Sequence, residues 1–210
     1  MEIVLSLGGS FISDRPHEVR RLRGVLKRVS RNAIVVVGGG DLAREYIRFA
    51  GLLGLTKRSL HRVGIKATLI NAFILSEVLD GEFFDGDPRR LRKRGLIVTG
   101  GFKPGWTTDT CAAYAAVSSG ADVIFNISKE KGVYDMDPEK FRNAKLLRHI
   151  KFDELRKMTG AERKPGMNFI FDPMAATICK RHKIKVVVTN RITDVADYLK
   201  NGTTKGTIID

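Results

Sequence analysis

The chain has 210 residues, of which 43% are hydrophobic and 29% are charged, as in an ordinary folded globular protein. This composition excludes a disordered or fibrous chain, and no apolar run approaches the roughly 18 residues of a membrane span. The start, MEIVLSLGG, lacks a basic segment and predicts a strand, not a signal peptide. Cys111 and Cys179 lie far apart, which favours neither a disulfide framework nor a zinc site. We therefore expect a cytoplasmic protein.

Lysine and arginine exceed aspartate and glutamate by 37 to 23, which gives a net charge of +14 and a sequence pI near 10.0. Such a charge attracts polyanions, either nucleic acid or small phosphorylated ligands. The basic residues are spread over 15–31, 57–66, 89–94 and 140–157 instead of forming one tail. This dispersion favours a generally basic surface, so we expect no nucleic-acid partner.

Strand and helix patterns alternate along the chain. Residues 2–7 form an apolar run that ends in a glycine turn, and aliphatic residues at helical spacing predict an amphipathic helix over 16–31. The polar stretch 80–95 receives no assignment, and the segment after 127 is expected to be irregular. Further strands are predicted over 33–37, 96–99, 121–127, 185–189 and 207–209. Further helices are predicted over 41–53, 64–79 and 194–200, from Thr107-Thr108-Asp109 to about 118, and from Asp172-Pro173 onward. We expect Asp41 to cap the first of these helices.

The predicted strands are apolar on both faces and alternate with helices, which is typical of a largely parallel sheet covered on both sides. No Pro-rich or Ser-rich linker, internal repeat or low-complexity tract divides the chain. We predict an α/β fold with a single domain over 1–210, a three-layer α/β/α sandwich whose amino-terminal and carboxy-terminal halves meet at a cleft.

Three of the predicted strands end in glycine clusters, at Gly8-Gly9, Gly38-Gly39-Gly40 and Gly100-Gly101. In an open parallel sheet the carboxyl ends of the strands form the ligand crevice. Glycine lets the backbone approach a ligand there, and the following helix adds a positive dipole end. The three clusters predict a site for more than one phosphate group, although each could also serve only as a tight turn. The chain contains no GxxxxGK[ST], GxGxxG or HExxH motif, and its histidines are scattered.

Six segments in this order resemble the amino acid kinase family, most closely its archaeal uridylate (UMP) kinase branch. They are LGGS at 7–10, VVVGGGDLAREY at 35–46, TGGFKPGWTTDTCAA at 99–113, KGVYDMDP at 131–138, DPMAA at 172–176 and GTTKGTII at 202–209. The resemblance covers essentially the whole chain and implies the amino acid kinase fold. It also implies a pyrimidine-nucleotide enzyme that transfers the γ-phosphate of ATP to UMP with Mg²⁺, assembled as a homohexamer. The UMP-binding half would span about 1–120 and the ATP-binding half about 121–210.

The resemblance implies a role for individual residues. Lys129 would be a catalytic cation, and Asp109 would hold a positively charged side chain, although the bare sequence allows it equally to cap its helix. The residues implied for ATP are Gly9, Ser10, Gly40, Arg44, Ser128, Lys129, Tyr134 and Asp137. The residues implied for UMP are Gly39, His61, Gly101, Phe102, Lys103, Pro104, Gly105, Trp106 and Thr107, with Thr107 and Thr108 as hydroxyl donors. No residue is implied as a metal ligand.

The implied chemistry needs no general base, because a phosphate monoester with a second pKa near 6 is mostly dianionic at neutral pH. It needs cations and N–H groups around the transferred phosphoryl group: Mg²⁺, the glycine turns and Lys129. Trp106 has two interpretations, either a ring that covers the bound acceptor or a hydrophobic plug under its loop.

Two positions depart from the family pattern. Ser6 stands where many members have a lysine that reaches the transferred phosphate, and His61 stands where relatives usually present an acidic residue to the ribose. Two alternatives therefore stay open: a kinase of another phosphate, such as isopentenyl phosphate, and a non-catalytic anion-binding protein on the same fold. No histidine follows the second glycine turn, which argues against the isopentenyl phosphate branch. The loop 101–107 argues against carboxylate acceptors.

Overall fold

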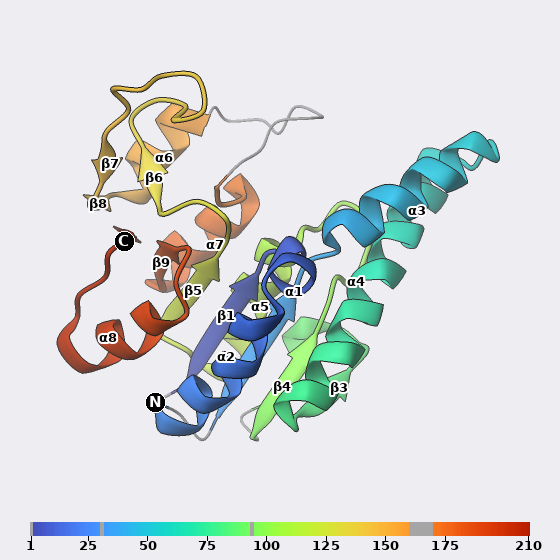
Figure 1. Ribbon diagram of the computed structural model, residues 1–210, viewed down its shortest axis with the longest axis horizontal. Helices are drawn as coiled ribbons and strands as arrows, with labels where there is room; N and C mark the ends of the chain where they lie inside the picture. Colours follow the sequence, from blue (N-terminus) through green and yellow to red (C-terminus); the bar gives the residue numbers. More distant parts are fainter. Residues whose placement is uncertain (1, 30–31, 93–94, 160–169) are drawn as a thin grey trace.

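The structure is a computed structural model that describes residues 2–29, 32–92, 95–159 and 170–210. It confirms the three-layer α/β/α architecture, with one large sheet between two layers of helices (Figure 1). The strand order of this sheet is β3-β4-β2-β1-β5-β9-β10-β8. All of its described pairings are parallel except that between β10 and β9. Its strands are β1 (Ile3–Leu7), β2 (Ala33–Val37), β3 (Glu82–Phe84), β4 (Leu96–Thr99), β5 (Val123–Ile127), β8 (His149–Ile150), β9 (Lys185–Thr189) and β10 (Thr207–Ile209).

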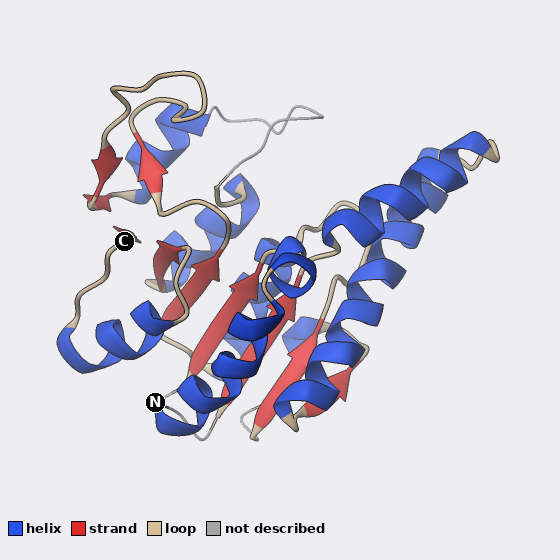
Figure 2. Cartoon of the chain, in the orientation of Figure 1, coloured by secondary structure: helices blue, strands red, loops and turns tan. Residues whose placement is uncertain are grey.

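The central strands form because their side chains are buried on both faces of the sheet, so the whole run is apolar. Val4 of β1 lies in register with Ile34 of β2 and Ile124 of β5, and all three belong to one core layer. The neighbouring residues Leu5 and Val35 belong to the opposite layer. The first layer is closed by α5 and α7, and the second by α2, α4 and α8, which lie in front of the sheet in Figure 2.

The helices connect these strands and largely follow the predicted periodicity. They are α1 (Ser10–Asp14), α2 (Pro16–Val29), α3 (Gly40–Leu52), α4 (Lys57–Leu79), α5 (Thr108–Ser119), α6 (Phe152–Thr159), α7 (Pro173–His182) and α8 (Thr193–Asn201). The predicted helix over 16–31 is confirmed to Val29, and its last two residues lie outside the described part of the chain.

Two predictions about helix starts are wrong. The helix predicted from 64 begins at Lys57, because Thr56 caps it by accepting a hydrogen bond from the Ser59 N–H at 3.3 Å. Its first turns are polar, so apolar periodicity did not reveal them. Asp41 does not cap α3: Gly39 occupies the cap position, and Asp41 forms an ion pair with Arg44 one turn further on.

The stretches without a confident assignment contain short elements. Residues 80–95 form the edge strand β3 and a 3₁₀ turn, η1 (Pro88–Arg90), although 93–94 lie outside the described residues. The segment after 127 contains α6, the edge strand β8 and a small antiparallel pair, β6 (Val133–Tyr134) with β7 (Leu146–Leu147). Strands of two or three residues are too short to produce a recognisable alternation of side chains.

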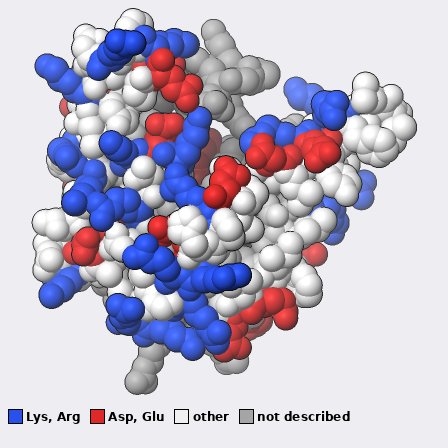
Figure 3. Space-filling model, in the orientation of Figure 1, with Lys and Arg blue, Asp and Glu red and all other residues white. Residues whose placement is uncertain are grey.

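Helices α3 and α4 extend beyond the sheet as an antiparallel arm (Figure 1). The tip of this arm is mostly uncharged in the space-filling view, whereas lysines and arginines are spread over the rest of that face (Figure 3). The arm exposes large hydrophobic side chains: Tyr46, Phe49, Leu52, Leu53, Leu55, Ile70, Phe73, Ile74 and Val78. Within the described residues, no helix is long and apolar enough to cross a membrane.

Candidate nucleotide site

The glycine turns lie at the carboxyl ends of neighbouring strands. In the order β4-β2-β1-β5, the turns at 100–101, 38–40 and 8–9 follow β4, β2 and β1, and Ser128 follows β5. Parallel strands bring these ends to one edge of the sheet, as expected for the ligand crevice of an open α/β fold. The acceptor residues predicted after β4 and the ATP residues predicted after β1 and β5 therefore flank the turn after β2.

The turns after β1 and β2 touch through their backbones. A Cβ on Gly9 would collide with the backbone of Gly40, and Gly40 has a φ of +56°, in the left-handed region. The hydrogen bonding between β1 and β2 continues into the turn after β2, because the Gly38 N–H donates to the Leu7 carbonyl at 2.9 Å. Glycine is required at this contact because any side chain would push the two turns apart.

Helix α4 fastens two of the glycine turns. Asn71 Nδ2 donates to the carbonyls of Gly38 at 2.9 Å and Gly39 at 3.2 Å. The Thr68 hydroxyl accepts from the Gly101 N–H at 2.7 Å and donates to a carbonyl of its own helix. Sequence reasoning missed both residues. The available signal was their polarity at i and i+3 within the otherwise apolar segment of α4.

His61 is exposed on α4, two turns before Thr68 and on the same face of the helix. The resemblance implies that this side chain contacts the ribose of UMP. Thr68 is buried and binds the loop backbone, whereas His61 is exposed, as are Arg62 and Lys66 of the same helix.

The acceptor loop 101–107 is organised around Trp106. The indole stacks on Tyr114 of α5, with ring centroids 4.4 Å apart and planes at 23°. Lys103 Nζ lies 4.2 Å from the indole centroid, and the Arg89 guanidinium lies 5.5 Å from it. Trp106 also packs against the core layer beneath the loop. This arrangement fits the interpretation of Trp106 as a hydrophobic plug. Phe102 is partly buried beside it, whereas Lys103, Pro104 and Gly105 are exposed.

Thr107 caps α5 and binds a residue that the sequence did not single out for the site. Its hydroxyl accepts from the Thr110 N–H at 3.1 Å and donates to Asp172 Oδ2 at 2.7 Å. The Thr110 hydroxyl donates to the same carboxylate oxygen. In this structure the Thr107 hydroxyl, predicted as a donor to UMP, thus has a protein partner.

Asp109 lies in the first turn of α5 and accepts a hydrogen bond from the Ser6 hydroxyl at 2.8 Å. The capping interpretation of Asp109 is wrong, because Thr107 provides the cap. Ser6 is only 2% exposed and lies on β1, three residues before Gly9. The position at which many family members carry a lysine therefore supplies a hydroxyl donor to the acidic residue.

The two predicted cations of the donor side lie at the surface near one another. Lys129 Nζ is 3.1 Å from Glu139 Oε1, and this hydrogen bond raises the pKa of Lys129 above its ordinary value, while the positive charge of Arg44 opposes the rise. Arg44 is itself paired with Asp41 through a 3.1 Å hydrogen bond from Nε. Each cation thus has an exposed carboxylate as its partner.

The other predicted ATP residues lie on several elements of the fold. Ser10 begins α1 directly after Gly9, and Ser128 follows β5, where its hydroxyl accepts from the Glu130 N–H at 3.2 Å. Tyr134 lies in β6. Asp137 accepts from the Glu139 N–H at 3.0 Å, and this bond is the main cause that lowers the pKa of Asp137.

The described residues contain no group of three or more His, Cys, Asp or Glu side chains that could hold a metal ion.

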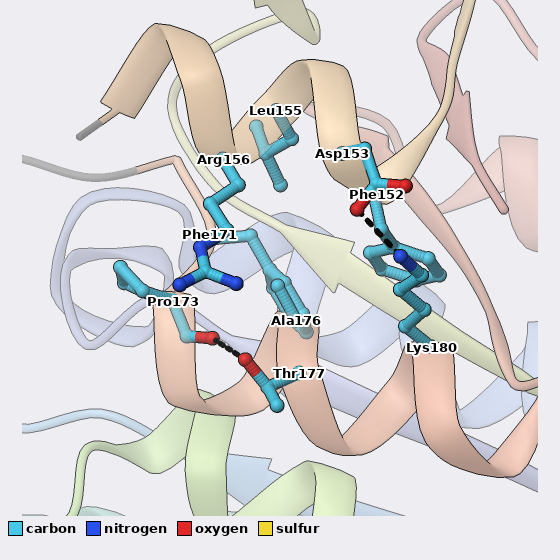
Figure 4. Close-up of a pocket in the computed structure, with 9 residues that line it drawn as sticks. All are labelled: Phe152, Asp153, Leu155, Arg156, Phe171, Pro173, Ala176, Thr177 and Lys180. Carbon is cyan, nitrogen blue, oxygen red and sulfur yellow. Dashed lines mark hydrogen bonds and ion pairs between the residues drawn. The ribbon is translucent and has the colours of Figure 1, made fainter. Parts of the chain in front are cut away.

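Two hollows lie away from the strand ends. One is a small crevice between α6 and α7, where Lys180 pairs with Asp153 (Figure 4). The other is a groove of about 480 Å³ along α3 and α4, lined by Tyr46, Leu55, Ser59, Arg62, Val63, Lys66, Ala67 and Ile70. Neither is lined by a predicted site residue, so the strand ends remain the candidate site.

Comparison with known proteins identifies the family. The model of the amino acid kinase family matches residues 1–190. A uridylate kinase of Thermoplasma volcanium is 35% identical over 200 residues, which cover 90% of this chain and 88% of that protein. A uridylate kinase of Methanothrix thermoacetophila is 36% identical over 222 residues, which cover 100% of this chain and 99% of that protein. The crystal structure of uridylate kinase from Archaeoglobus fulgidus has a TM-score of 0.83 at 31% identity and covers 100% of both chains. The chain belongs to the amino acid kinase family.

Proposed function

We propose that this protein is a uridylate kinase, which transfers the γ-phosphate of ATP to UMP and releases UDP and ADP. The observation that carries the proposal is the strand order β4-β2-β1-β5, which brings the acceptor loop after β4 to the same edge as the glycine turns and Lys129. Relatives that match the full chain at about a third identity carry the name uridylate kinase, which supports the same assignment.

In the acceptor half, about 1–120, UMP binds between the loop 101–107, Gly39 and His61. The exposed Lys103 ammonium and the N-terminal turn of α5 attract the phosphate of UMP. Trp106 supports this loop from below through its stack on Tyr114. His61 hydrogen-bonds a ribose hydroxyl, in place of the acidic residue usual in the family.

In the donor half, about 121–210, ATP lies against the residues that follow β5, together with the turns after β1 and β2. Gly9 and Gly40 bring the backbone close to the phosphates, and Ser10, Ser128, Tyr134 and Asp137 line the nucleotide. Mg²⁺ enters with the nucleotide as the Mg·ATP substrate. It neutralises phosphate charge there.

The transfer itself is a displacement at the γ-phosphorus. A phosphate oxygen of UMP forms the new P–O bond, and the bond to the bridging oxygen of ADP breaks. The dianionic acceptor supplies the electron pair, so no side chain has to remove a proton. Lys129 and Arg44 stabilise the charge on the transferred group after exchanging their carboxylate partners for phosphate oxygens. Asp109, held by Ser6, fixes the first turn of α5 between acceptor and donor.

The protein acts as a homo-oligomer in the cytoplasm, where it contributes to pyrimidine nucleotide synthesis. The exposed apolar side chains of the α3–α4 arm support self-association, because large groups of exposed apolar side chains on a folded protein commonly mark an interaction surface. A second copy of the same arm, and ultimately a hexamer, would cover it. Sedimentation velocity measures the assembly directly against the 23.4 kDa of one chain.

A coupled assay of ADP release across a panel of phosphate acceptors tests the function. We expect UMP to be phosphorylated well with Mg·ATP, and CMP, AMP and isopentenyl phosphate to be poor acceptors. Another acceptor turned over at least about tenfold more efficiently than UMP, in kcat/KM, would overturn the substrate while keeping the reaction class. ATP binding without turnover of any acceptor would favour the non-catalytic alternative.

A further inference from the structure

A buried carboxylate, Asp172, joins the acceptor loop to the donor half of the molecule. It is 8% exposed and lies directly before α7, where its Oδ1 caps that helix by accepting from the Met174 N–H at 3.1 Å. Its Oδ2 accepts the hydroxyls of Thr107 and Thr110, one at each end of the first turn of α5. Both carboxylate oxygens are therefore used, each toward a different helix.

The backbone next to Asp172 is fixed to the donor half. Asn126 of β5 is 5% exposed, and its Nδ2 donates to the carbonyl of Ile170 at 2.9 Å. Asn126 lies two residues before Ser128, so the same strand carries both the proposed ATP residues and the anchor of the segment 170–172. A continuous chain of buried hydrogen bonds thus runs from β5 through this segment to the end of the acceptor loop.

We propose that Asp172 is a positioning residue for the acceptor: it holds the loop 101–107 and the first turn of α5 at a fixed distance from the donor half. The inference rests on the proposed kinase function. Phosphoryl transfer depends on the placement of the two phosphates more than on covalent participation of the protein. A carboxylate is needed at this position because it accepts at both oxygens. An asparagine side chain at 172 would have one oxygen and one NH₂ group, and the NH₂ group would face a hydrogen-bond donor of either α5 or α7.

The structure provides a matched control in Asp194. This residue is also buried, at 0% exposure, and lies in the first turn of a helix, α8. Its Oδ2 accepts two threonine hydroxyls, from Thr189 at 2.8 Å and Thr204 at 2.9 Å. Its Oδ2 also accepts from the Lys205 N–H at 3.1 Å. Helix α8 covers the opposite face of the sheet from α5 and follows β9, so Asp194 is a second buried carboxylate that binds two threonine hydroxyls, at a place away from the acceptor loop.

The experiment compares Asp172→Asn, Thr110→Val and Asp194→Asn by steady-state kinetics with UMP and Mg·ATP. We expect Asp172→Asn to raise KM for UMP by about tenfold or more while KM for ATP changes less than about twofold. Thr110→Val removes one of the two hydroxyls and should produce a smaller change in the same direction. It also provides the test if Asp172→Asn does not fold. Asp194→Asn should lower the melting temperature and leave KM for UMP unchanged.

A second readout does not depend on activity. Trp106 is the only tryptophan of the sequence and lies in the acceptor loop, so its quenching by acrylamide reports how firmly that loop is held. The quenching constant should rise in Asp172→Asn and stay at the wild-type value in Asp194→Asn. Parallel increases in both KM values, or quenching equal in these two variants, would overturn the proposal. If the wild-type protein fails to phosphorylate UMP, the proposed function fails, and the quenching comparison still decides the role of Asp172.

Discussion

The acceptor and donor sides of the proposed site are held in place by different kinds of interaction. On the acceptor side, Thr68, Asn71 and Asp172 are buried and hydrogen-bond the glycine turns or the end of the loop. On the donor side, the side chains of Lys129 and Arg44 are 66% and 69% exposed and pair with surface carboxylates.

Because of this difference, we expect the two sides to contribute to different properties: the acceptor side to the stability of the fold, and the donor side to the rate of turnover. Buried hydrogen bonds fix groups before a substrate arrives, and losing one leaves an unpaired polar atom in the interior. Exposed ion pairs contribute little to stability and exchange partners easily, which suits cations that must move from a carboxylate to a phosphate. We therefore expect substitutions on the acceptor side to reduce the free energy of unfolding, and substitutions on the donor side to reduce turnover without affecting the fold.

The largest effect is expected for Lys129→Ala. Loss of this cation should lower kcat by about two orders of magnitude, the scale of removing one electrostatic stabiliser of the transition state. The melting temperature should stay close to that of the wild type, because Lys129 is mostly exposed. Lys180→Ala, which removes another exposed ion-paired lysine, on α7, is the control. Near-normal turnover of Lys129→Ala would show that this lysine is only a surface residue.

An intermediate effect is expected for Asn71→Ala. The substitution leaves the carbonyls of Gly38 and Gly39 without their side-chain donor, which should reduce the free energy of unfolding by about 1–3 kcal/mol. Urea denaturation measures this change. Glu77→Ala, at an exposed position of the same helix, should change it by less than about 0.5 kcal/mol. Equal stability of the two variants would contradict the idea that α4 fastens the second glycine turn.

The smallest effect is expected for Glu139→Gln, and it concerns pH. Glu139 raises the pKa of Lys129, so the substitution should lower that pKa toward its ordinary value of 10.5. In the free enzyme Lys129 then loses its proton at a lower pH, and the alkaline fall of kcat/KM for Mg·ATP should begin earlier in the variant than in the wild type. At neutral pH both proteins keep Lys129 charged and should have similar kcat. An alkaline limb that does not move would indicate that Lys129 is not the group whose charge supports turnover.

Much of the fold was predictable from local patterns. The runs in β1, β2 and β5 are apolar along their whole length because helices cover both faces of the sheet, and each run predicts a buried strand. The glycine clusters after β1 and β2 predicted close backbone approach to a ligand, which stays a prediction. The structure shows a different requirement for glycine there, the backbone contact between Gly9 and Gly40. Amphipathic periodicity located α2 to within two residues of its described end.

The detailed site depended on tertiary structure. Ser6 and Asp109 are 103 residues apart in the chain, and Thr107 and Asp172 are 65 apart, yet each pair shares a hydrogen bond. Such pairs arise from the order of strands in the sheet and the packing of α7 on α5, which no local period encodes. The sequence by itself determined where the longer strands of the sheet lie and where their glycine ends fall. Only the packed sheet decided which polar side chains meet there, because a hydrogen bond requires two groups to be brought within about 3 Å of one another.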